Sequence, residues 1–492
     1  MPTLTILTGG PARVTVRADD GTWCRPAGAV RDRTASDSPE VLGMDRPGDG
    51  SAVRPGYVEH ALVDGTAEVV VPRGGCTVVV ERGPEHRRVE RRVDVGPAGA
   101  RVTAVPERWS DLAAEGWWSG DLHVHRPLAD AAAILRAEDL HLGAFVTAWT
   151  GRETASPRRE ERAQVHDQRP RAALTVDGDR HAVAPVTEDE RGGGAWLLHG
   201  VEVADLPPTE AWWSPPGRGI VDRARAQGAW FDCEKLTWWE TPVMVATGAP
   251  DSVGVLSNHY LPGGVVANEA WGRPRDRSVW PGTAGAWRYQ LHLYYRYLSC
   301  GLRLPASAGS ASGALPAPPG YDRVYVQAPG PFTVDAFYAG LRAGRSVVTN
   351  GPLLTLLVDD AGPGGTVAAR RTPVRVVARG ATPVDGVELV VDGRVVAGGR
   401  GPLLETTLDL RRAGWVAARA FSPDPVTVRL AHTGPVHVAG PGSPDAATHR
   451  GFFARWVADL TSAARSDRHR FPTPAAREET LDLYHRAARY WA

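Results

Sequence analysis

Short runs that alternate apolar with polar residues dominate the first hundred positions of the chain. ARVTVRA, AEVVVP, CTVVVERG and RRVDVG are rich in β-branched residues and are separated by Gly, Pro and Asp turns. A period of two is typical of strands that bury one face. The pattern predicts a small β-sandwich over residues 1–106.

From residue 107 onward, strand-like runs alternate with segments of helical periodicity. WWSGDLHVH, GAFVTAW, GAWLLHGVEV, GAWFDCE, DSVGVLSNH and GRSVVTN have the pattern of strands. ADAAAILRAEDLHL, GIVDRARAQ, WRYQLHLYYRYLSCG and TVDAFYAGLRAG have the pattern of helices. Repeated βα units favour a (β/α) barrel or a doubly wound sheet over residues 107–353.

The last part of the chain returns to strands and then ends in helices. Residues 354–440 contain further β-branched runs, and VVDGRVV carries an Asp-Gly hairpin signal, which together predict a second β-sandwich. Residues 441–492 contain two helical segments, GFFARWVADLTSAARS and PAAREETLDLYHRAARYW. Thr473 followed by Pro474 suits the N-cap and first turn of the second helix.

Composition excludes some classes of partner. Lys plus Arg and Asp plus Glu both number 56 in 492 residues, so no net charge attracts nucleic acid or an anionic membrane. The four cysteines are far apart and lack C-x-x-C spacing, which indicates buried small side chains. The chain begins without a basic segment and an apolar run, and no stretch approaches about 18 apolar residues. A cytoplasmic location is therefore the default expectation, with export left open.

Lys235 is the single lysine of the chain, and Asn258, Asn268 and Asn350 are the only asparagines. Abundant Gly, Ala, Pro and Arg suggest coding pressure against residues with AT-rich codons. The single lysine and the three asparagines all lie between positions 235 and 350, whereas residues retained by chance would be scattered over the whole chain. For Lys235, chance survival or an ion pair with a neighbouring acid is the alternative.

Nearly every strand predicted between residues 107 and 353 ends in polar residues. These are Asp121, His123 and His125, then Glu188 to Glu190, Glu234 and Lys235, Asn258 and His259, Ser307, Ser310 and Ser312, and Asn350. In a barrel of parallel strands such ends meet at one face. The spacing of two between the histidines places both imidazoles on one side of a strand, as in a pair of metal ligands.

Each of these signals has a structural alternative. The two histidines can be satisfied core residues, EDER can be a solvated turn, and GSASG can be a plain loop rather than an anion cradle. The Trp-Trp pairs at 117–118, 212–213 and 238–239 can be core residues rather than an aromatic wall for substrate. Convergence of imidazoles and carboxylates favours a hydrolytic site, because a metal ion activates water and a carboxylate accepts its proton.

The stretch GWWSGDLHVHRP at residues 116–127 resembles the opening motif of PHP-type (polymerase and histidinol phosphatase) metal-dependent hydrolases, in particular the CehA/McbA branch. RAEDLH, GLRLPASAGSASG, LRAGRSVVTNGPL and VVDGRVV look like later parts of that branch. The resemblance implies a distorted (β/α)7 barrel between β domains, a cluster of divalent metals, and hydrolysis of phosphoesters, carbamates or related bonds.

The chain departs from the family pattern at three strand ends. Ala148 and Trp149 stand where the pattern has Asp-His, Glu234 and Lys235 stand where it has His-Pro, and Ser310 to Ser312 stand where it has Asp-x-His. His123 and His125 carry over directly, and Glu188 matches a glutamate ligand by its place before GGGAWLLHG. The chain therefore resembles a divergent subgroup.

Two functional hypotheses follow. In the first, the chain is a hydrolase that uses one or two divalent ions, zinc or manganese, on a small-molecule or glycan-like substrate. The expected ligands are His123, His125, Glu234 and His259, the expected catalytic residues are Asp121, Glu188, Lys235 and Asn258, and the expected substrate-binding residues are Trp149, Trp238, Ser310, Ser312 and Asn350. In the second, the barrel has lost catalysis and binds a glycan or another small polar ligand.

Overall fold

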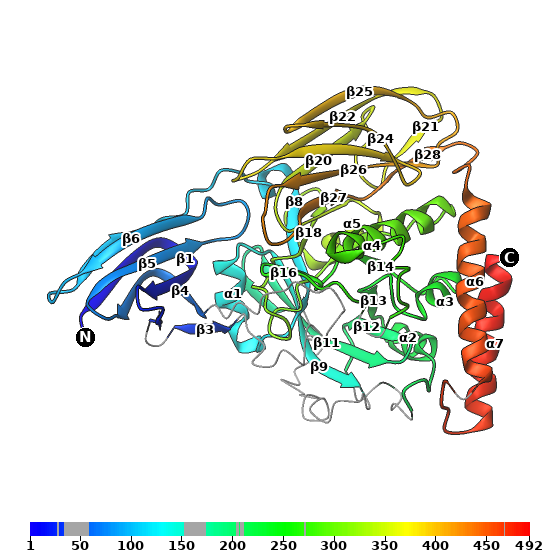
Figure 1. Cartoon of the computed structure of the whole chain (residues 1–492), viewed down its shortest axis with the longest axis horizontal. Helices are drawn as coiled ribbons and strands as arrows, with labels where there is room; N and C mark the ends of the chain where they lie inside the picture. The colour runs from blue at the N-terminus through cyan, green and yellow to red at the C-terminus, as the bar shows by residue number, and fades with distance from the viewer. Residues whose placement is uncertain are drawn as a thin grey trace.

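The computed structural model describes residues 1–26, 29–33, 59–151, 174–202, 206, 211–269, 272–466 and 468–492. The chain is a mixed α/β protein built on large multi-stranded sheets. Figure 1 shows the N-terminal strands at one end, a central part of strands and helices, and a pair of C-terminal helices at the opposite end.

The strands of the first hundred residues form a sheet of their own. Within the described residues its order is β3-β4-β1-β5-β6, and β2 and β7 also pair with β1. The bounds are β1 (Thr3–Ala18), β2 (Trp23–Cys24), β3 (Val30–Arg33), β4 (Glu59–Val70), β5 (Gly74–Glu81), β6 (Val89–Val95) and β7 (Ala100–Thr103). Cys76, Val78 and Val80 alternate toward a buried core, as the period of two predicts. The β character of this region is confirmed.

The central sheet places six strands in one direction. They are β8 (Trp117–Val124), β9 (Leu142–Gly151), β11 (Arg180–Arg191), β13 (Trp230–Cys233), β14 (Ser252–Leu256) and β17 (Ala306–Ala308). β12 (Gly194–His199) runs antiparallel between β11 and β13. A parallel bridge between Val124 and Ser312 joins the segment after β17 to the end of β8. The carboxyl ends of the six strands therefore meet at one face.

The antiparallel hairpin of β11 and β12 was not expected from the sequence. Glycines 192 to 194 connect the two strands, and Gly194 has φ +155°, which favours glycine. A Cβ added at Gly192 would lie 2.5 Å from the ring of Trp213. The predicted alternation of parallel strands and helices is therefore interrupted here, and EDER lies in a buried strand instead of a solvated turn.

The helices cover the central sheet and connect its strands. Their bounds are α1 (Ala131–Ala137), α2 (Gly217–Arg225), α3 (Thr241–Ala246), α4 (Gly282–Ser299) and α5 (Val334–Arg342). α1 is shorter than the helix predicted over residues 129–142, because Asp139 turns the chain with φ +50°. The buried Asp139 carboxylate accepts hydrogen bonds from Arg108 at 2.6 Å and Arg180 at 2.8 Å, which stabilises the turn.

The C-terminal strands continue the central sheet. β18 (Arg323–Gln327) pairs with β8, β19 (Ser346–Thr349) pairs with β18, and β27 (Arg429–Thr433) pairs with β19. The remaining strands are β20 (Leu353–Val358), β21 (Thr366–Ala368), β22 (Arg371–Arg379), β23 (Gly386–Val391), β24 (Arg394–Arg400), β25 (Leu403–Asp409), β26 (Trp415–Ser422) and β28 (Val436–Ala439). Asp392 and Gly393 both have positive φ and form the predicted hairpin turn between β23 and β24. Backbone pairing thus crosses the boundary predicted at residues 353 and 354.

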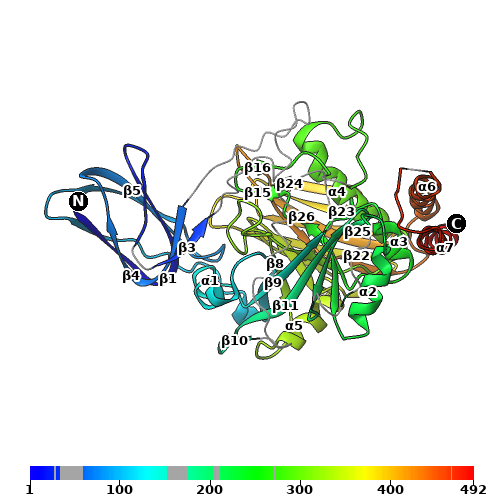
Figure 2. The same cartoon turned by 90° about the horizontal axis from the view of Figure 1, so that it is seen from below.

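Two small strand pairings lie beside the central sheet. β10 (Leu174–Asp177) is antiparallel to β11, and β15 (Tyr260–Leu261) forms a hairpin with β16 (Gly264–Val265). Figure 2 shows β10 near α5 and the β15–β16 hairpin on the other side of the central strands. The β15–β16 hairpin directly follows the polar end of β14.

The C-terminal helices α6 (Ala446–Arg465) and α7 (Pro474–Trp491) pack against α3 and against each other. The Thr473 side chain accepts a hydrogen bond from the backbone N–H of Ala476, which confirms the predicted cap. The Tyr484 hydroxyl donates to Glu240 at 2.7 Å, and the Trp491 indole N–H donates to the Pro242 carbonyl at 2.9 Å. None of the helices among the described residues is both long and apolar enough to span a membrane.

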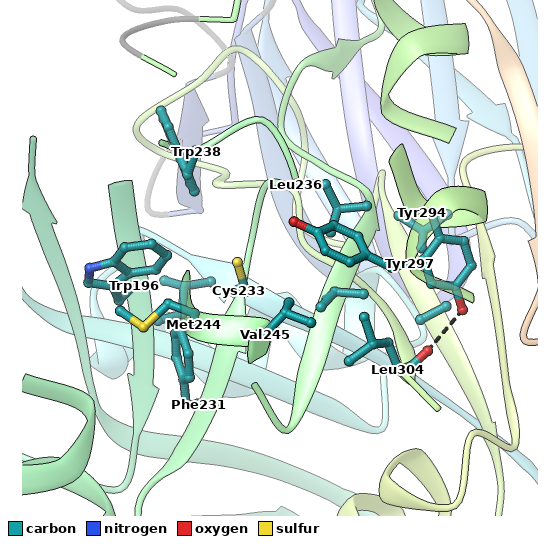
Figure 3. Packing of buried hydrophobic residues seen from close by; sticks show 14 of the residues in the cluster. Trp196, Phe231, Cys233, Leu236, Trp238, Met244, Val245, Tyr294, Tyr297 and Leu304 are labelled. Atoms are coloured by element: carbon teal, nitrogen blue, oxygen red, sulfur yellow. Dashed lines mark hydrogen bonds between the residues drawn. The ribbon is translucent and has the colours of Figure 1, made fainter. Parts of the chain in front are cut away.

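The largest hydrophobic core lies between the central strands and these helices. Figure 3 shows Trp196, Phe231 and Met244 together, with Tyr294 donating a hydrogen bond to the Leu304 carbonyl at 2.9 Å. Cys76, Cys233 and Cys300 are buried free thiols, and Cys24 is a half-buried one, in agreement with the sequence prediction.

Candidate metal centre

The first strand of the central sheet carries the histidine pair. Asp121, His123 and His125 alternate along β8 or directly follow it, so their side chains share one side. All three are buried, and His125 is 8% exposed. β8 lies between β9 and β18, which fixes its position from both edges.

Two imidazoles and one carboxylate converge on a single point. Nε2 of His123 lies 2.8 Å from Nε2 of His125 and 3.3 Å from Oε2 of Glu188. Nε2 of His125 lies 2.9 Å from the same oxygen. One ligand atom of each residue lies within 4.8 Å of the others, and this buried group could hold a metal ion. Two nitrogens and one oxygen form a donor set used by catalytic zinc sites.

Glu188 reaches this point from the buried strand β11. In β11 successive residues face opposite sides, so Asp189 points away from Glu188. Asp189 forms a buried ion pair with Arg191. Of these two acids, Glu188 belongs to the group that could hold a metal ion, which is called the metal-binding group below, and Asp189 does not.

Glu234 lies on the opposite edge of the His123 ring from Glu188. Its Oε1 is 3.1 Å from Nδ1 of His123, directly after β13. A carboxylate at Nδ1 holds the proton on that nitrogen and directs the lone pair of Nε2 toward a metal. The sequence predicted Glu234 as a ligand, whereas the structure places it against Nδ1 of His123 and outside the converging group of three.

Lys235 completes a chain of charges from the metal-binding group into the protein. Its Nζ donates to Oε2 of Glu234 at 2.8 Å and lies 4.7 Å from the centre of the Trp238 ring. Lys235 is 4% exposed. The ammonium is therefore held by a carboxylate and an aromatic face, which is a favourable setting for a buried cation.

The charges of this cluster are strongly coupled. Although burial acts against it, the carboxylates of Glu188 and Glu234 raise the pKa of His123 to about 10. Burial alone would raise the pKa of both carboxylates. The charges of Lys235 and His123 instead lower the pKa of Glu234 to about 2, and those of His123 and His125 lower the pKa of Glu188. The ionised Glu188 carboxylate therefore faces the point where the imidazole nitrogens meet, and Glu234 adds a second negative charge at the far edge of the His123 ring, which together favour a cation at this point.

Asp121, which was predicted as a catalytic residue, has both carboxylate oxygens engaged by donors of the protein. Its two oxygens accept hydrogen bonds from the N–H groups of His123, Ser310 and Gly320 and from the Ser310 hydroxyl, at 2.5 to 3.0 Å. Burial raises its pKa, and these hydrogen bonds oppose the rise. Four donors occupy the carboxylate, so Asp121 anchors the segment after β17 to β8.

The GSASG segment uses its polar groups internally. The Ser312 N–H donates to the Ser310 hydroxyl at 3.1 Å, and the Ser312 hydroxyl accepts from Nε of Arg126 at 3.2 Å. The Ser312 carbonyl accepts from the N–H of His125 at 2.7 Å. The predicted substrate-binding role of Ser310 and Ser312 is therefore not what these contacts favour, since both side chains hold the protein together.

Polar atoms without partners lie at the end of β14. Oδ1 of Asn258 and Nδ1 of His259 are buried and have no hydrogen-bond partner. Burial, followed by the charge of Lys235, lowers the pKa of His259 to about 3, so its ring is neutral at pH 7. His259 was predicted as a metal ligand, but it does not belong to the converging group.

Trp149 and Asn350, both predicted to bind substrate, lie in two different places in the structure. The Trp149 ring lies 4.8 Å from the ring of His125, beside the metal-binding group. Asn350 instead donates to the Val428 carbonyl at 3.1 Å and accepts from the Leu430 N–H at 2.8 Å, and it lines a separate cavity. Trp149 thus belongs with the site, and Asn350 joins β19 to β27.

Three glycines whose role was not predicted from the sequence lie in close contact with residues of the site. A Cβ added at Gly309 would lie 2.5 Å from Cβ of His123. A Cβ at Gly254 would overlap the Glu234 carbonyl, and one at Gly313 would overlap the His125 carbonyl. The glycines of GSASG were visible in the sequence, but only the neighbouring backbone shows that their missing side chains are needed.

No protein-family model matches the chain, and the search of curated proteins finds no similar sequence.

Proposed function

We propose that the protein is a metal-dependent hydrolase of the PHP type, similar to the CehA/McbA branch, with its active site at His123, His125 and Glu188. The observation that carries the proposal is the convergence of Nε2, Nε2 and Oε2 of these three residues on one buried point. These three atoms lie 2.8 to 3.3 Å from one another, so they could exchange the hydrogen bonds that they share for bonds to one metal ion.

The strand arrangement supports a distorted (β/α) barrel as the fold around this site. Six strands run in one direction, and the bridge between Val124 and Ser312 brings the first and last of them together. Catalytic groups in such barrels lie at the carboxyl ends of the strands. The metal-binding group and Glu234 lie at or near the ends of β8, β11 and β13.

A single zinc or manganese ion fits the donor set best. His123, His125 and Glu188 would hold it, which leaves coordination positions for water and substrate. A divalent ion in such a site supplies Lewis acidity and lowers the pKa of water. Glu234 would act as a positioning residue, because it keeps the proton of His123 on Nδ1.

The remaining polar groups suggest how a substrate is held. Oδ1 of Asn258 and Nδ1 of His259 are buried without partners, and the Trp149 ring stands beside His125. These groups could bind the polar atoms and a flat face of a small substrate. Phosphoesters, carbamates and related esters or amides are the bond types that metal-activated water attacks.

The first experiment measures metal content by elemental analysis after loading with zinc or manganese. Wild-type protein is expected to retain about one ion per chain, and His123→Ala and His125→Ala are expected to retain none. Glu234→Gln keeps the ligands and should weaken metal affinity by about 10- to 100-fold. His485→Ala, on helix α7, is the matched control and should bind like wild type.

Substrate panels then distinguish the hydrolase from a binding protein. Loaded wild-type protein should cleave at least one phosphoester, carbamate or ester, and the two histidine variants should not. Absence of stoichiometric metal would contradict the hydrolase. Intact glycan ligand after incubation, with affinity insensitive to chelators, would favour the alternative of a catalytically inactive binding barrel.

A further inference from the structure

A cavity lies where the three β regions of the chain meet. It has a volume of about 590 Å³ and is lined by the N-terminal strands, by the segments 262–263 and 316–323, and by residues near the starts of β20 and β27. Its lining includes none of His123, His125 and Glu188. Its volume falls within the range of small-molecule sites.

The lining of this cavity is strongly cationic. Arginines 13, 82, 88, 323 and 429 line it, against the two carboxylates of Glu81 and Glu138. Both carboxylates are engaged by Arg13, at 3.1 Å for Glu81 and 3.4 Å for Glu138. Among the residues that the structure describes, no carboxylate lies within ion-pair distance of Arg82, Arg323 or Arg429.

Arg323 is the least expected of these cations. It is 2% exposed, and its Nε and Nη2 donate only to the backbone carbonyls of Gly320 at 2.7 Å and Glu138 at 3.2 Å. Its Nη1 has no hydrogen-bond partner. Burial of a guanidinium without a counter-ion is costly, so a bound anion would supply what the protein lacks.

Neutral polar and apolar groups complete the wall. His60, whose Nδ1 lies 2.7 Å from the Thr15 hydroxyl, has a pKa well below its ordinary value because of burial and the nearby charges of Arg13 and Arg126. Trp23, Tyr321 and Pro318 provide apolar surface for a carbon skeleton.

We propose that this cavity binds a compact organic anion with two or more negative charges, carried by phosphate or carboxylate groups, at a site separate from the metal centre. Arg82, Arg323 and Arg429 bind the charged groups, because a guanidinium matches both phosphate and carboxylate in a bidentate geometry. Arg82 directly follows β5 of the N-terminal sheet, whereas Arg323 and Arg429 lie on β18 and β27 of the large sheet, so the ligand joins these two sheets.

The test is titration calorimetry on the full chain, freed of metal with a chelating resin, with pyrophosphate and with citrate as probes. At least one probe is expected to bind with a Kd below about 1 mM. Binding of pyrophosphate alone assigns the ligand to phosphates, and binding of citrate alone assigns it to carboxylates. Binding of both supports recognition by charge. If neither probe binds, the proposal is wrong.

Variants locate the binding. The side chains of Arg82 and Arg429 are only partly buried, so the variants Arg82→Met and Arg429→Met should both fold. Each substitution should weaken binding of the probe by about tenfold or more. Arg101→Met, exposed on strand β7 and outside the cavity, is the matched control and should bind like wild type. Wild-type affinity in both cavity variants would overturn the proposal.

A final variant separates this site from the proposed active site. His123→Ala lacks a metal ligand and should bind the probe with unchanged affinity, even if the hydrolase proposal fails. Loss of probe binding in His123→Ala would assign the anion to the metal centre and would overturn a separate site.

Discussion

Lys235 shows how one residue connects a compositional oddity to the chemistry of the site. Its ammonium neutralises Glu234, and Glu234 in turn holds Nδ1 of His123. Lys235 is only 4% exposed. The guanidinium of an arginine is larger and planar, so it would not fit this buried position in the same way. The ion pair was an alternative at the level of sequence, and here it joins the metal-binding group.

Replacement of Lys235 tests this connection. In metal-free protein, Lys235→Met should lower the free energy of unfolding by about 3 kcal/mol or more, because it leaves Glu234 with a buried charge that lacks its ammonium. The double variant Glu234→Gln, Lys235→Met should recover most of this loss. Urea unfolding measures both. If Lys235→Arg keeps wild-type metal content and activity, the lysine itself is a chance survivor.

At the level of elements, the segment after β17 sets the position of β8. Asp121 accepts four hydrogen bonds from it and from β8, and the His125 N–H donates to the Ser312 carbonyl. Gly309 lets this segment approach His123 closely. The segment therefore acts as a support for the two histidines.

Gly309→Ala tests the close approach. The added Cβ would lie 2.5 Å from Cβ of His123, so either β8 or the segment after β17 must shift. We expect metal affinity to fall by about tenfold or more, with a loss of stability of about 1 to 3 kcal/mol. Gly219→Ala in helix α2, where a Cβ meets no neighbour within 4 Å, is the control. Equal metal affinity in both variants would show that β8 does not need this contact.

For the whole molecule, buried neutral histidines make stability sensitive to acid. His432 joins the central part to the C-terminal strands: its Nε2 accepts from the Tyr295 hydroxyl at 2.9 Å, and its Nδ1 lies 2.7 Å from the Thr433 carbonyl. Burial is the main cause that lowers the pKa of His432 to about 3. The hydrogen bond to Thr433 opposes this shift, and the charge of Arg419 adds to it. Below about pH 6.5 the imidazole of His432 therefore binds a proton in the unfolded chain but stays neutral in the folded chain until the pH approaches its lowered pKa.

The sign of the acid effect follows from this difference. Above about pH 6.5 both states are neutral at His432, and as the pH falls below that value the unfolded state is favoured. At pH 5 the contribution of this one residue is about 2 kcal/mol. Unfolding free energies measured from pH 7 to 4.5 should fall less steeply in His432→Gln. An unchanged slope would contradict the assignment.

Much of the local structure could be predicted because it depends on neighbours in sequence. The alternation in β5, the Asp392-Gly393 turn and the Thr473 cap each follow from side-chain spacing or backbone preference over a few residues. The helical span around α1 was overestimated, because the turn at Asp139 depends on Arg108 and Arg180.

The sequence by itself determined the strand that carries His123 and His125, since a spacing of two on a strand places both rings on one side. It also indicated polar strand ends as candidates. Only the tertiary structure decided which of them meet: Glu188 joins the histidines, Glu234 lies behind His123, and Asp121 is used for support. The physical reason is that coordination and hydrogen bonding require atoms within about 3 Å, and residues more than 60 positions apart reach that distance only through packing.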